Sequence, residues 1–479
     1  MSPESEASPR RGIFHAFREA LSSEQRDYTK GSIPRGIWLL AVPMVIELLG
    51  ESVFALCDIY FVSQVSDAAA AAVGLTESML TIVYALAIGL AMSTTALVAR
   101  RIGEGNVDGA VRAATAAIAV GVIGGLLVGV PGFLFPEKLL GLMKAPASVI
   151  EIGSGYTRVI LGFNIVVMLI HLLNAIFRGA GDASLAMKSL LLANAINLIL
   201  DPCLIFGLGP FPEMGVTGAA LATTTGRGIG VLFQLYLLRH GTGRIVLRGP
   251  AVRLRMHLVW EILRLSLGSI GQLLIATTSW VILMRLVAPF GEAALAGYTY
   301  AIRIVIFAFL PAWGLSNAAA TLVGQNLGAG QPDRAERSVW LTGFYNMIFL
   351  GLVMVLFLAT APWLVGHFTE DRATLETGIS ALRILSYGYL FYAWGMVMTQ
   401  AFNGAGDTMT PTWINFFCFW CFQIPFAWAF STRFGFGPPG VFWSACLAEL
   451  LLAGVAIAIF RRGKWKTTEI AADPGAGDP

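Results

Sequence analysis

The feature that most constrains this chain is a series of apolar segments of about 20 residues or more, the length that an α-helix needs to cross a lipid bilayer. Only 13% of its 479 residues are charged, against about 25% in ordinary soluble domains. A soluble fold would leave much of this apolar surface in water and would aggregate. Backbone polar groups in lipid must be satisfied within the segment itself, so each span is predicted to be a helix.

Twelve such spans can be distinguished, in two groups of six. The first group comprises residues 36–62, 70–99, 110–134, 152–177, 184–208 and 215–239. The second group comprises residues 260–287, 293–323, 338–362, 376–401, 411–433 and 438–460. The predicted fold class is therefore an all-α integral membrane protein with 12 transmembrane helices.

The Lys and Arg residues indicate the orientation in the membrane. Most of them fall in segments that share one side if the two ends of the chain lie on that side, including residues 10–35, 239–264 and 461–466. The positive-inside rule assigns these segments to the cytoplasm. We therefore expect a multi-pass protein of the cell inner (plasma) membrane with both termini cytoplasmic.

An internal repeat relates the two groups of helices. With a shift of 225 residues, residues 178–182 (RGAGD) align with 403–407 (NGAGD), and residues 98–112 align with 323–337 without a gap. One constant offset across separate places indicates duplication. Six helices per copy give both copies the same orientation, so the copies are predicted to be related by a pseudo-twofold axis along the membrane normal.

The repeat and the charge pattern predict the domain boundaries. The segment near 240–258 is basic and lacks a long apolar run, so it reads as a linker between the halves. The predicted units are a cytoplasmic N-terminal tail (1–32), a first six-helix bundle (33–240), a cytoplasmic linker (241–258), a second bundle (259–461) and a disordered cytoplasmic tail (462–479).

The first apolar span carries three acidic residues, Glu47, Glu51 and Asp58. At 100° per residue they fall on one stripe of a helix, which must face protein or water rather than lipid. Pro43 precedes them and removes a backbone hydrogen bond, which favours a bend. This helix is a candidate coupling element. Alternatively, Glu47 and Glu51 lie beside a water-filled vestibule without a specific role.

The fifth span carries Asn197 and Asp201, four residues apart and hence on one face. Together with a carboxylate from a neighbouring helix they could bind Na⁺ through oxygen ligands, or they could hold a proton, because burial and a nearby like charge favour the protonated carboxyl. The alternative is a polar contact between helices. The positions that correspond to Asp58, Asn197 and Asp201 in the second half are not acidic: they are Leu283, Phe422 and Phe426.

The second-half counterpart of the fifth span is aromatic, which suggests apolar contact with a substrate, or simply packing. Other charges within apolar spans support no strong assignment: Glu77, Arg227, Arg285, Arg303 and Glu449. Arg227 either pairs with an acidic side chain or extends to the surface. The two GAGD segments lie at helix ends and lack the lysine of a phosphate loop, so they read as tight turns.

Several motifs follow one another along the chain: Pro43 with residues 56–62 (LCDIYFV), 178–182, 197–202 (NLILDP), 215–223 (GVTGAALAT) and the second GAGD at 404–407. This ordered set resembles the multidrug and toxic compound extrusion (MATE) family. The resemblance covers roughly residues 33–461. It implies a V-shaped fold of two bundles around a central cavity, and export of amphipathic, often cationic organic compounds in exchange for H⁺ or Na⁺.

The pair Asn197 and Asp201 looks like the DinF-type prokaryotic branch of that family. The resemblance implies a polar pocket in the first half, lined by Asp58, Asn197, Asp201 and a threonine, for which Thr223 is the match. Glu47 and Glu51 are not part of that pattern and are taken as additional cavity acids.

The predicted function is secondary antiport rather than enzymatic catalysis. One rival is a lipid-precursor flippase of the same superfamily, which would favour a cationic cavity, whereas the predicted stripe is acidic. A rival of another class is an intramembrane transferase, for which no clustered carboxylate motif is found in a cytoplasmic loop. We expect a small-molecule substrate and membrane lipid as partners, no nucleic acid, no cofactor beyond the coupling ion, and a monomer.

Overall fold

The computed structural model describes residues 13–22, 26–241, 243–249 and 252–470, and these residues form helices joined by loops, without a strand. The first half contains α1 (Ile13–Leu21), α2 (Ile33–Ser63), α3 (Asp67–Gly103), α4 (Val107–Leu134), α5 (Pro136–Leu142), α6 (Ala147–Gly162), α7 (Ile165–Ala180), α8 (Ala183–Phe206) and α9 (Val216–His240). The second half contains α10 (Met256–Val287), η1 (Ala288–Phe290), α11 (Glu292–Gly328), α12 (Pro332–Gly366), α13 (Arg372–Tyr387), α14 (Tyr389–Ala405), α15 (Met409–Asn415), η2 (Phe416–Gln423), α16 (Ile424–Trp428), η3 (Ala429–Arg433), α17 (Pro438–Arg461) and η4 (Lys464–Thr467).

The long helices confirm the predicted all-α membrane fold. By length and composition, ten helical segments in the described part of the chain could cross a membrane. α9 and the consecutive pair α13 and α14 bring the number of membrane-length segments to twelve. Two of the predicted spans are broken into two helices, at residues 163–164 and at Gly388.

The helix boundaries repeat with the offset found in the sequence. α3 and α11 differ by 225 residues at both ends, and so do α6 and α13. Each GAGD segment places its second glycine in the left-handed region, with φ of 90° at Gly181 and 86° at Gly406. Both glycines end a helix (α7 and α14), as predicted for tight turns, because glycine adopts this conformation without a steric cost.

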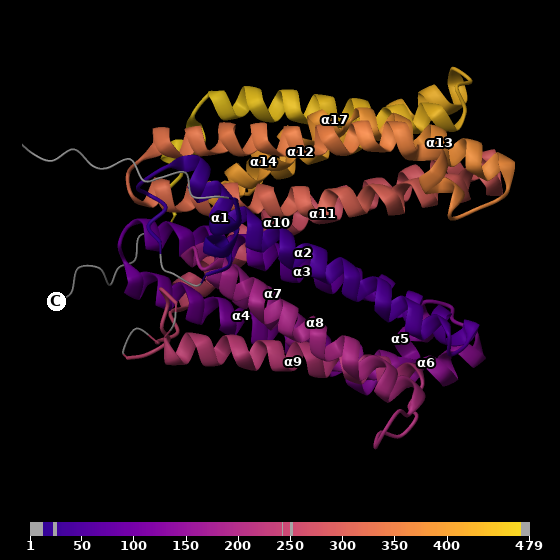
Figure 1. Ribbon diagram of the computed structural model, residues 1–479, viewed down its shortest axis with the longest axis horizontal. Helices are drawn as coiled ribbons and strands as arrows, with labels where there is room; N and C mark the ends of the chain where they lie inside the picture. Colours follow the sequence, from indigo (N-terminus) through magenta and orange to yellow (C-terminus); the bar gives the residue numbers. More distant parts are fainter. Residues whose placement is uncertain (1–12, 23–25, 242, 250–251, 471–479) are drawn as a thin grey trace, which may run out of the picture.

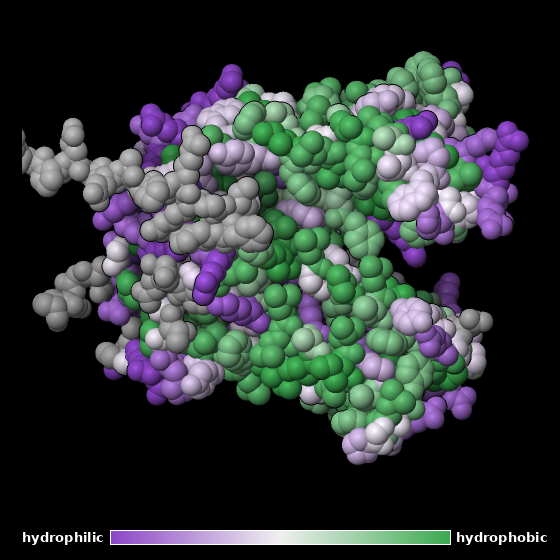
Figure 2. All heavy atoms as spheres, in the orientation of Figure 1, coloured by the Kyte–Doolittle hydropathy of each residue, from purple (hydrophilic) through white to green (hydrophobic). Residues whose placement is uncertain are grey.

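The two halves form two lobes that meet along α2, α3, α10 and α11 (Figure 1). A notch separates the lobes at the end of the molecule opposite α1, and hydrophilic side chains gather at both ends of a largely hydrophobic middle (Figure 2). The fold is therefore V-shaped, as the family resemblance implied, and the V opens at the end where α5, α6 and α13 lie (Figure 1).

The closed end of the V depends on a symmetric crossing of α3 and α11. A Cβ on Gly103 would lie 2.0 Å from the carbonyl oxygen of Gln325, and a Cβ on Gly328 would lie 2.2 Å from the carbonyl oxygen of Arg100. These two contacts are related by the same 225-residue offset. Only glycine allows the backbones to approach so closely, so both copies of the repeat retain it here.

The segment after α17 differs from the predicted disordered tail at 462–479. Residues 464–467 form η4, Trp465 is buried, and its ring stacks on Phe460 at 4.6 Å. The ammonium group of Lys466 lies 2.6 Å from a carboxylate oxygen of Glu336 on α12. The prediction of disorder is wrong up to residue 470 because an apolar ring and a charge both find partners. Residues 471–479 lie outside the described residues.

Candidate ion-binding site

The first half contains a polar pocket of about 330 Å³ between α2, α3, α6, α7 and α9. Its polar lining comes from Glu51 and Asp58 of α2, Glu77, Thr81 and Tyr84 of α3, Tyr156 of α6, and Thr223, Thr224 and Arg227 of α9. α2 and α9 are remote in sequence, so the fold brings the acidic stripe against a helix that carries a guanidinium group. The pocket therefore mixes carboxylates with one buried cation.

Arg227 is buried, with 5% of its surface exposed, and it pairs within the pocket. Its Nη2 lies 2.7 Å from Oε1 of Glu51, and its Nη1 donates to the Tyr84 hydroxyl at 3.1 Å. The guanidinium also lies over the ring of Phe54, 5.3 Å from its centroid. Of the two alternatives for Arg227, the structure has the ion pair, which also accounts for the charge of Glu51.

Glu47 belongs to a separate network. Its Oε1 accepts a hydrogen bond of 3.0 Å from Asn174 and lies 3.4 Å from Nη2 of Arg178. Asn174 in turn accepts a hydrogen bond from Gln234. The three acids of the predicted stripe thus have different surroundings: Glu47 and Glu51 each face an arginine, and Asp58 pairs with no Lys or Arg of the described residues.

The family resemblance groups Asp58, Asn197, Asp201 and Thr223 in one polar pocket, and the structure places them on α2, α8 and α9. The side-chain amide of Asn197 donates to Asp201 at 3.3 Å and to the hydroxyl of Thr223 at 3.0 Å. Asp58 and Thr223 line the pocket, whereas Asn197 and Asp201 are buried and do not line it. Asp58 lies close enough to Asp201 for their charges to interact.

Several oxygen atoms of this group have no partner. Oδ1 of Asp58, Oδ1 of Asn197 and Oδ2 of Asp201 are buried without a hydrogen bond in the described structure. Carboxylate, amide and hydroxyl oxygens are the ligand types that hard cations accept. Among the described residues, no group of three or more His, Cys, Asp or Glu side chains is placed to hold a metal ion, so a Na⁺ ion here would depend on Asn197 and Thr223 as well as the two carboxylates.

The second half replaces this polar group with apolar packing. Leu283, the counterpart of Asp58, is buried in a hydrophobic cluster. Phe422 and Phe426, the counterparts of Asn197 and Asp201, stack at 5.3 Å, and Phe426 stacks on Phe430 at 3.9 Å. The asymmetry between the halves that the sequence indicated is thus present as a polar pocket in one half and a ladder of rings in the other.

Pro43 lies buried inside α2, and the helix continues on both sides of it. A proline at this place leaves one backbone carbonyl without its helical donor, which makes α2 the easiest of the pocket helices to bend. Tyr84 and Tyr156 were not identified from the sequence. Helical spacing shows what one helix presents on a face, but it does not show which helix lies opposite.

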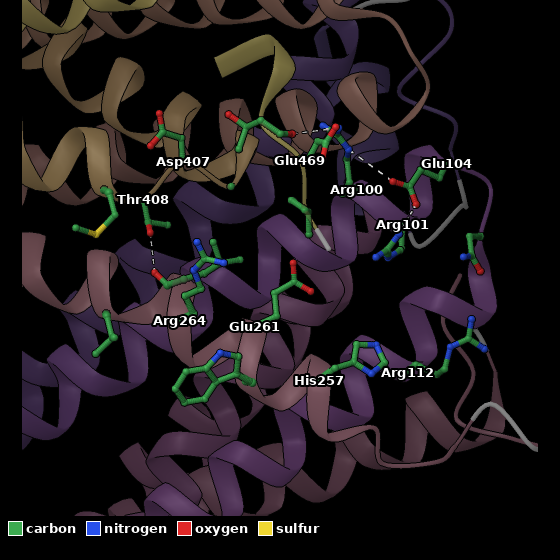
Figure 3. A pocket seen from close by; sticks show the side chains of 18 of the residues that line it. Arg100, Arg101, Glu104, Arg112, His257, Glu261, Arg264, Asp407, Thr408 and Glu469 are labelled. Atoms are coloured by element: carbon green, nitrogen blue, oxygen red, sulfur yellow. Dashed lines mark hydrogen bonds and ion pairs between the residues drawn. The ribbon is translucent and has the colours of Figure 1, made fainter. Parts of the chain in front are cut away.

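A larger pocket of about 1660 Å³ lies between the two halves at the end where α1 lies. Arg100, Arg101 and Glu104 line it from the first half, and Arg264 and Asp407 line it from the second (Figure 3). Its charges are mixed in sign, and no predicted site residue lines it. The backbone oxygen of Thr468 accepts a hydrogen bond of 3.4 Å from Arg100, so the segment after α17 also connects the two halves.

Two repeated bundles, a cleft open at one end and unpaired carboxyl groups inside one bundle define a multi-pass membrane protein with the architecture of a secondary transporter. The MatE family profile matches residues 43–203 and 269–429, one stretch in each half. The chain belongs to the MatE family, which confirms the resemblance described above.

Known proteins are similar to this chain over most of its length. The chain is 28% identical over 441 residues to the probable multidrug resistance protein NorM of Thermotoga maritima, covering 89% of this chain and 92% of that protein. It is 23% identical to the multidrug export protein MepA of Staphylococcus aureus, covering 90% of this chain and 94% of that protein. A solved structure described as the outward-facing conformation of a multidrug resistance MATE family transporter has a TM-score of 0.86 at 26% identity, covering 93% of this chain and 100% of that chain.

Proposed function

We propose that this chain is an antiporter that exports amphipathic, often cationic organic compounds in exchange for H⁺ or Na⁺. Membership of the MatE family and its similarity to multidrug resistance and multidrug export proteins support export of drug-like molecules. The exchange mechanism rests on one observation: the buried carboxyl groups of Asp58 and Asp201 make no ion pair with a Lys or Arg of the described residues.

The acids Glu47, Glu51, Asp58 and Asp201 differ in their charged partners. An ionised side chain at mid-membrane costs about 2.5–3.5 kcal/mol on insertion scales. Arg178 and Arg227 lower this cost for Glu47 and Glu51, whereas Asp58 and Asp201 pair with no Lys or Arg of the described residues. A small cation that binds Asp58 and Asp201 supplies the missing charge, and Asn197 and Thr223 supply further oxygen atoms.

The proposed cycle starts from the conformation with the cleft open opposite α1. We place the protein in the inner membrane with both termini in the cytoplasm. The cleft then opens to the outside, so this conformation is the outward-facing state. Ion binding removes repulsion between Asp58 and Asp201, α2 bends at Pro43, and the drug leaves outward. Each charge that crosses the membrane gains about 2.3 kcal/mol per 100 mV, which is enough to bias the return step.

The ladder of Phe422, Phe426 and Phe430 is the proposed apolar contact for the substrate. Aromatic faces attract organic cations as well as apolar groups, which fits amphipathic cationic compounds. The acidic pocket of the first half disfavours the flippase alternative, because a pyrophosphate headgroup needs cationic partners. The proposed working unit is a monomer.

Transport in proteoliposomes tests the proposal. Drug uptake against its gradient is measured with separately imposed pH and sodium gradients, using the wild type, Asp58→Asn and the exposed control Glu376→Gln. We expect one gradient to drive transport by the wild type and by the control, and the Asp58→Asn variant to lose it. The proposal would be contradicted if neither gradient drives transport by the wild type. Full transport by Asp58→Asn would also contradict it.

A further inference from the structure

The second half contains a small cavity that is the repeat counterpart of the first-half pocket. It is enclosed by α10, α11, α13, α14, η2 and α17, and about 20 Å³ is available to the centre of a water-sized sphere. Seven of its eleven lining residues lie 225 positions after a residue that lines the pocket of the first half. Examples are Trp280 after Ala55, Phe309 after Tyr84 and Glu449 after Thr224.

Glu449 is the acid of this second cavity. It lies on α17, whereas the unpaired acids of the first half lie on α2 and α8. It is buried, with 7% of its surface exposed, and its carboxyl group makes no ion pair or hydrogen bond with any described residue. The space is large enough for about one water molecule. A charged carboxylate in such a place has no compensating cation, so a proton is the simplest partner.

The polar surroundings of Glu449 come from the helix opposite. Gln423 lines the same cavity, and its Oε1 accepts a hydrogen bond of 2.8 Å from Ser279. This bond fixes the amide and leaves its Nε2 hydrogens as donors. Gln423 ends a π-helical stretch, Phe416–Gln423, where the first half has a regular α-helix. π-helical distortions are frequent at functional sites.

The ionisable groups around Glu449 are neutral ones. A charge on Glu449 would interact electrostatically with three nearby side chains, namely Tyr392 of α14, Cys418 of η2 and Cys446 of α17. Ordinary phenol and thiol groups are uncharged at pH 7. The cavity residues on α10, α11 and α13 are Trp280, Val305, Phe309 and Leu385, which do not titrate.

We propose that Glu449 is a second proton-binding site, in the second half, whose proton is exchanged in each transport cycle. The carboxylate takes up a proton through the water-sized cavity and releases it when the second half changes conformation. The side-chain amide of Gln423 is the hydrogen-bond donor that stabilises the charged form. This site takes a proton rather than Na⁺, because one carboxylate and one amide give too few oxygen ligands for a metal ion. The inference rests on the proposed ion-driven export.

Two measurements on the full chain test this site. Infrared difference spectra of the purified protein are recorded during a pH titration, for the wild type, Glu449→Gln, Glu449→Thr (which copies Thr224) and the exposed control Glu370→Gln. We expect a titrating carboxylic-acid band that both Glu449 variants lack and the control keeps. In proteoliposomes with a pH gradient of one unit, losing one coupled proton should lower the largest drug gradient about tenfold, since each proton contributes a factor of ten per pH unit.

The outcomes separate this inference from the proposed function. If the wild type sustains a drug gradient and both Glu449 variants sustain the same gradient, or if the infrared titration is unchanged in them, the second proton site is overturned. If the wild type transports under no ion gradient, the proposed function fails instead. The infrared titration does not require transport, so it still decides whether Glu449 exchanges a proton in a variant that transports poorly.

Discussion

In the first half, Arg227 of α9 pairs with Glu51 of α2, whereas the corresponding positions of the second half are Leu452 of α17 and Ala276 of α10. The same pair of helices is thus joined by a partly buried ion pair in one copy and by apolar side chains in the other. The second half therefore shows that this arrangement of helices forms without the ion pair. The charged residues of the first half are therefore better explained by a role in transport than by a requirement for folding.

What the two halves share is backbone contact. Gly103 and Gly328 make equivalent close approaches, and Gly179 and Gly404 each face a carbonyl oxygen, of Thr95 and Ala320 respectively. A duplicated chain can change its polar residues while it keeps these small residues, because they set the distances between helices.

The largest effect on stability is expected at the ion pair. Arg227→Leu leaves Glu51, whose side chain is partly exposed, without its cation, so we expect a loss of about 2–4 kcal/mol, measured by thermal unfolding in detergent. The double variant Glu51→Ala with Arg227→Leu copies the second half and should recover most of this loss. The exposed pair Arg372–Glu376 is the control, where Arg372→Ala should cost less than about 1 kcal/mol.

If the double variant is as unstable as Arg227→Leu alone, the two halves are not interchangeable at these positions. The comparison between them would then fail, because the ion pair would be part of the architecture of the first half.

The next effect concerns the shared crossing. Gly103→Ala and Gly328→Ala each force a Cβ against a backbone oxygen, so we expect both to destabilise the protein by about 1–3 kcal/mol and to similar extents. Gly74→Ala is the control on α3, because nothing lies within 4 Å of the added Cβ. A large loss in one half and none in the other would show that the crossing is not symmetric.

The smallest effect is a pH dependence at the first GAGD segment. Burial raises the pKa of Asp182 to about 6, although its Oδ2 accepts the backbone N–H of Arg244 at 2.8 Å. The folded chain therefore keeps a proton that the unfolded chain has already lost between about pH 4 and pH 6. Stability falls as pH rises through this window, by up to about 2 kcal/mol.

Asp182→Asn should remove this pH dependence in unfolding experiments at several pH values. Asp407→Asn changes the same motif in the second half, at a half-buried position, and should leave the window in place because Asp182 is still present. An unchanged window in Asp182→Asn would assign the pH dependence to another group.

The fold could be predicted from the sequence because lipid permits few structures. Twelve membrane-length segments in two halves are predicted from three features: the length of the apolar spans, the positions of Lys and Arg, and the 225-residue offset. The breaks at residues 163–164 and at Gly388 were missed, since neither carries a proline and an interrupted apolar span reads like a continuous one. The order of residues 464–470 was also missed, because it depends on tertiary contacts of Trp465 and Lys466.

The site was predictable only in part. Asn197 makes hydrogen bonds to Asp201 and Thr223, but of the four residues only Asp58 and Thr223 line the pocket. The sequence leaves the role of Arg227 open, because a single sequence does not show that α9 faces Glu51. The sequence alone does not distinguish Glu449 from other charges in apolar spans. It stands out only because the residues that line the two cavities correspond through the 225-residue repeat.

In the proposed mechanism, the carboxyl groups of Asp58 and Asp201 bind the coupling ion. The most direct measurement is ion-driven drug uptake into proteoliposomes by Asp201→Asn, beside Phe426→Leu at the corresponding position of the second half. We predict that Asp201→Asn still binds the drug but does not accumulate it against a gradient, whereas Phe426→Leu keeps its ion dependence. Accumulation by Asp201→Asn equal to that of the wild type would contradict ion coupling at Asp201.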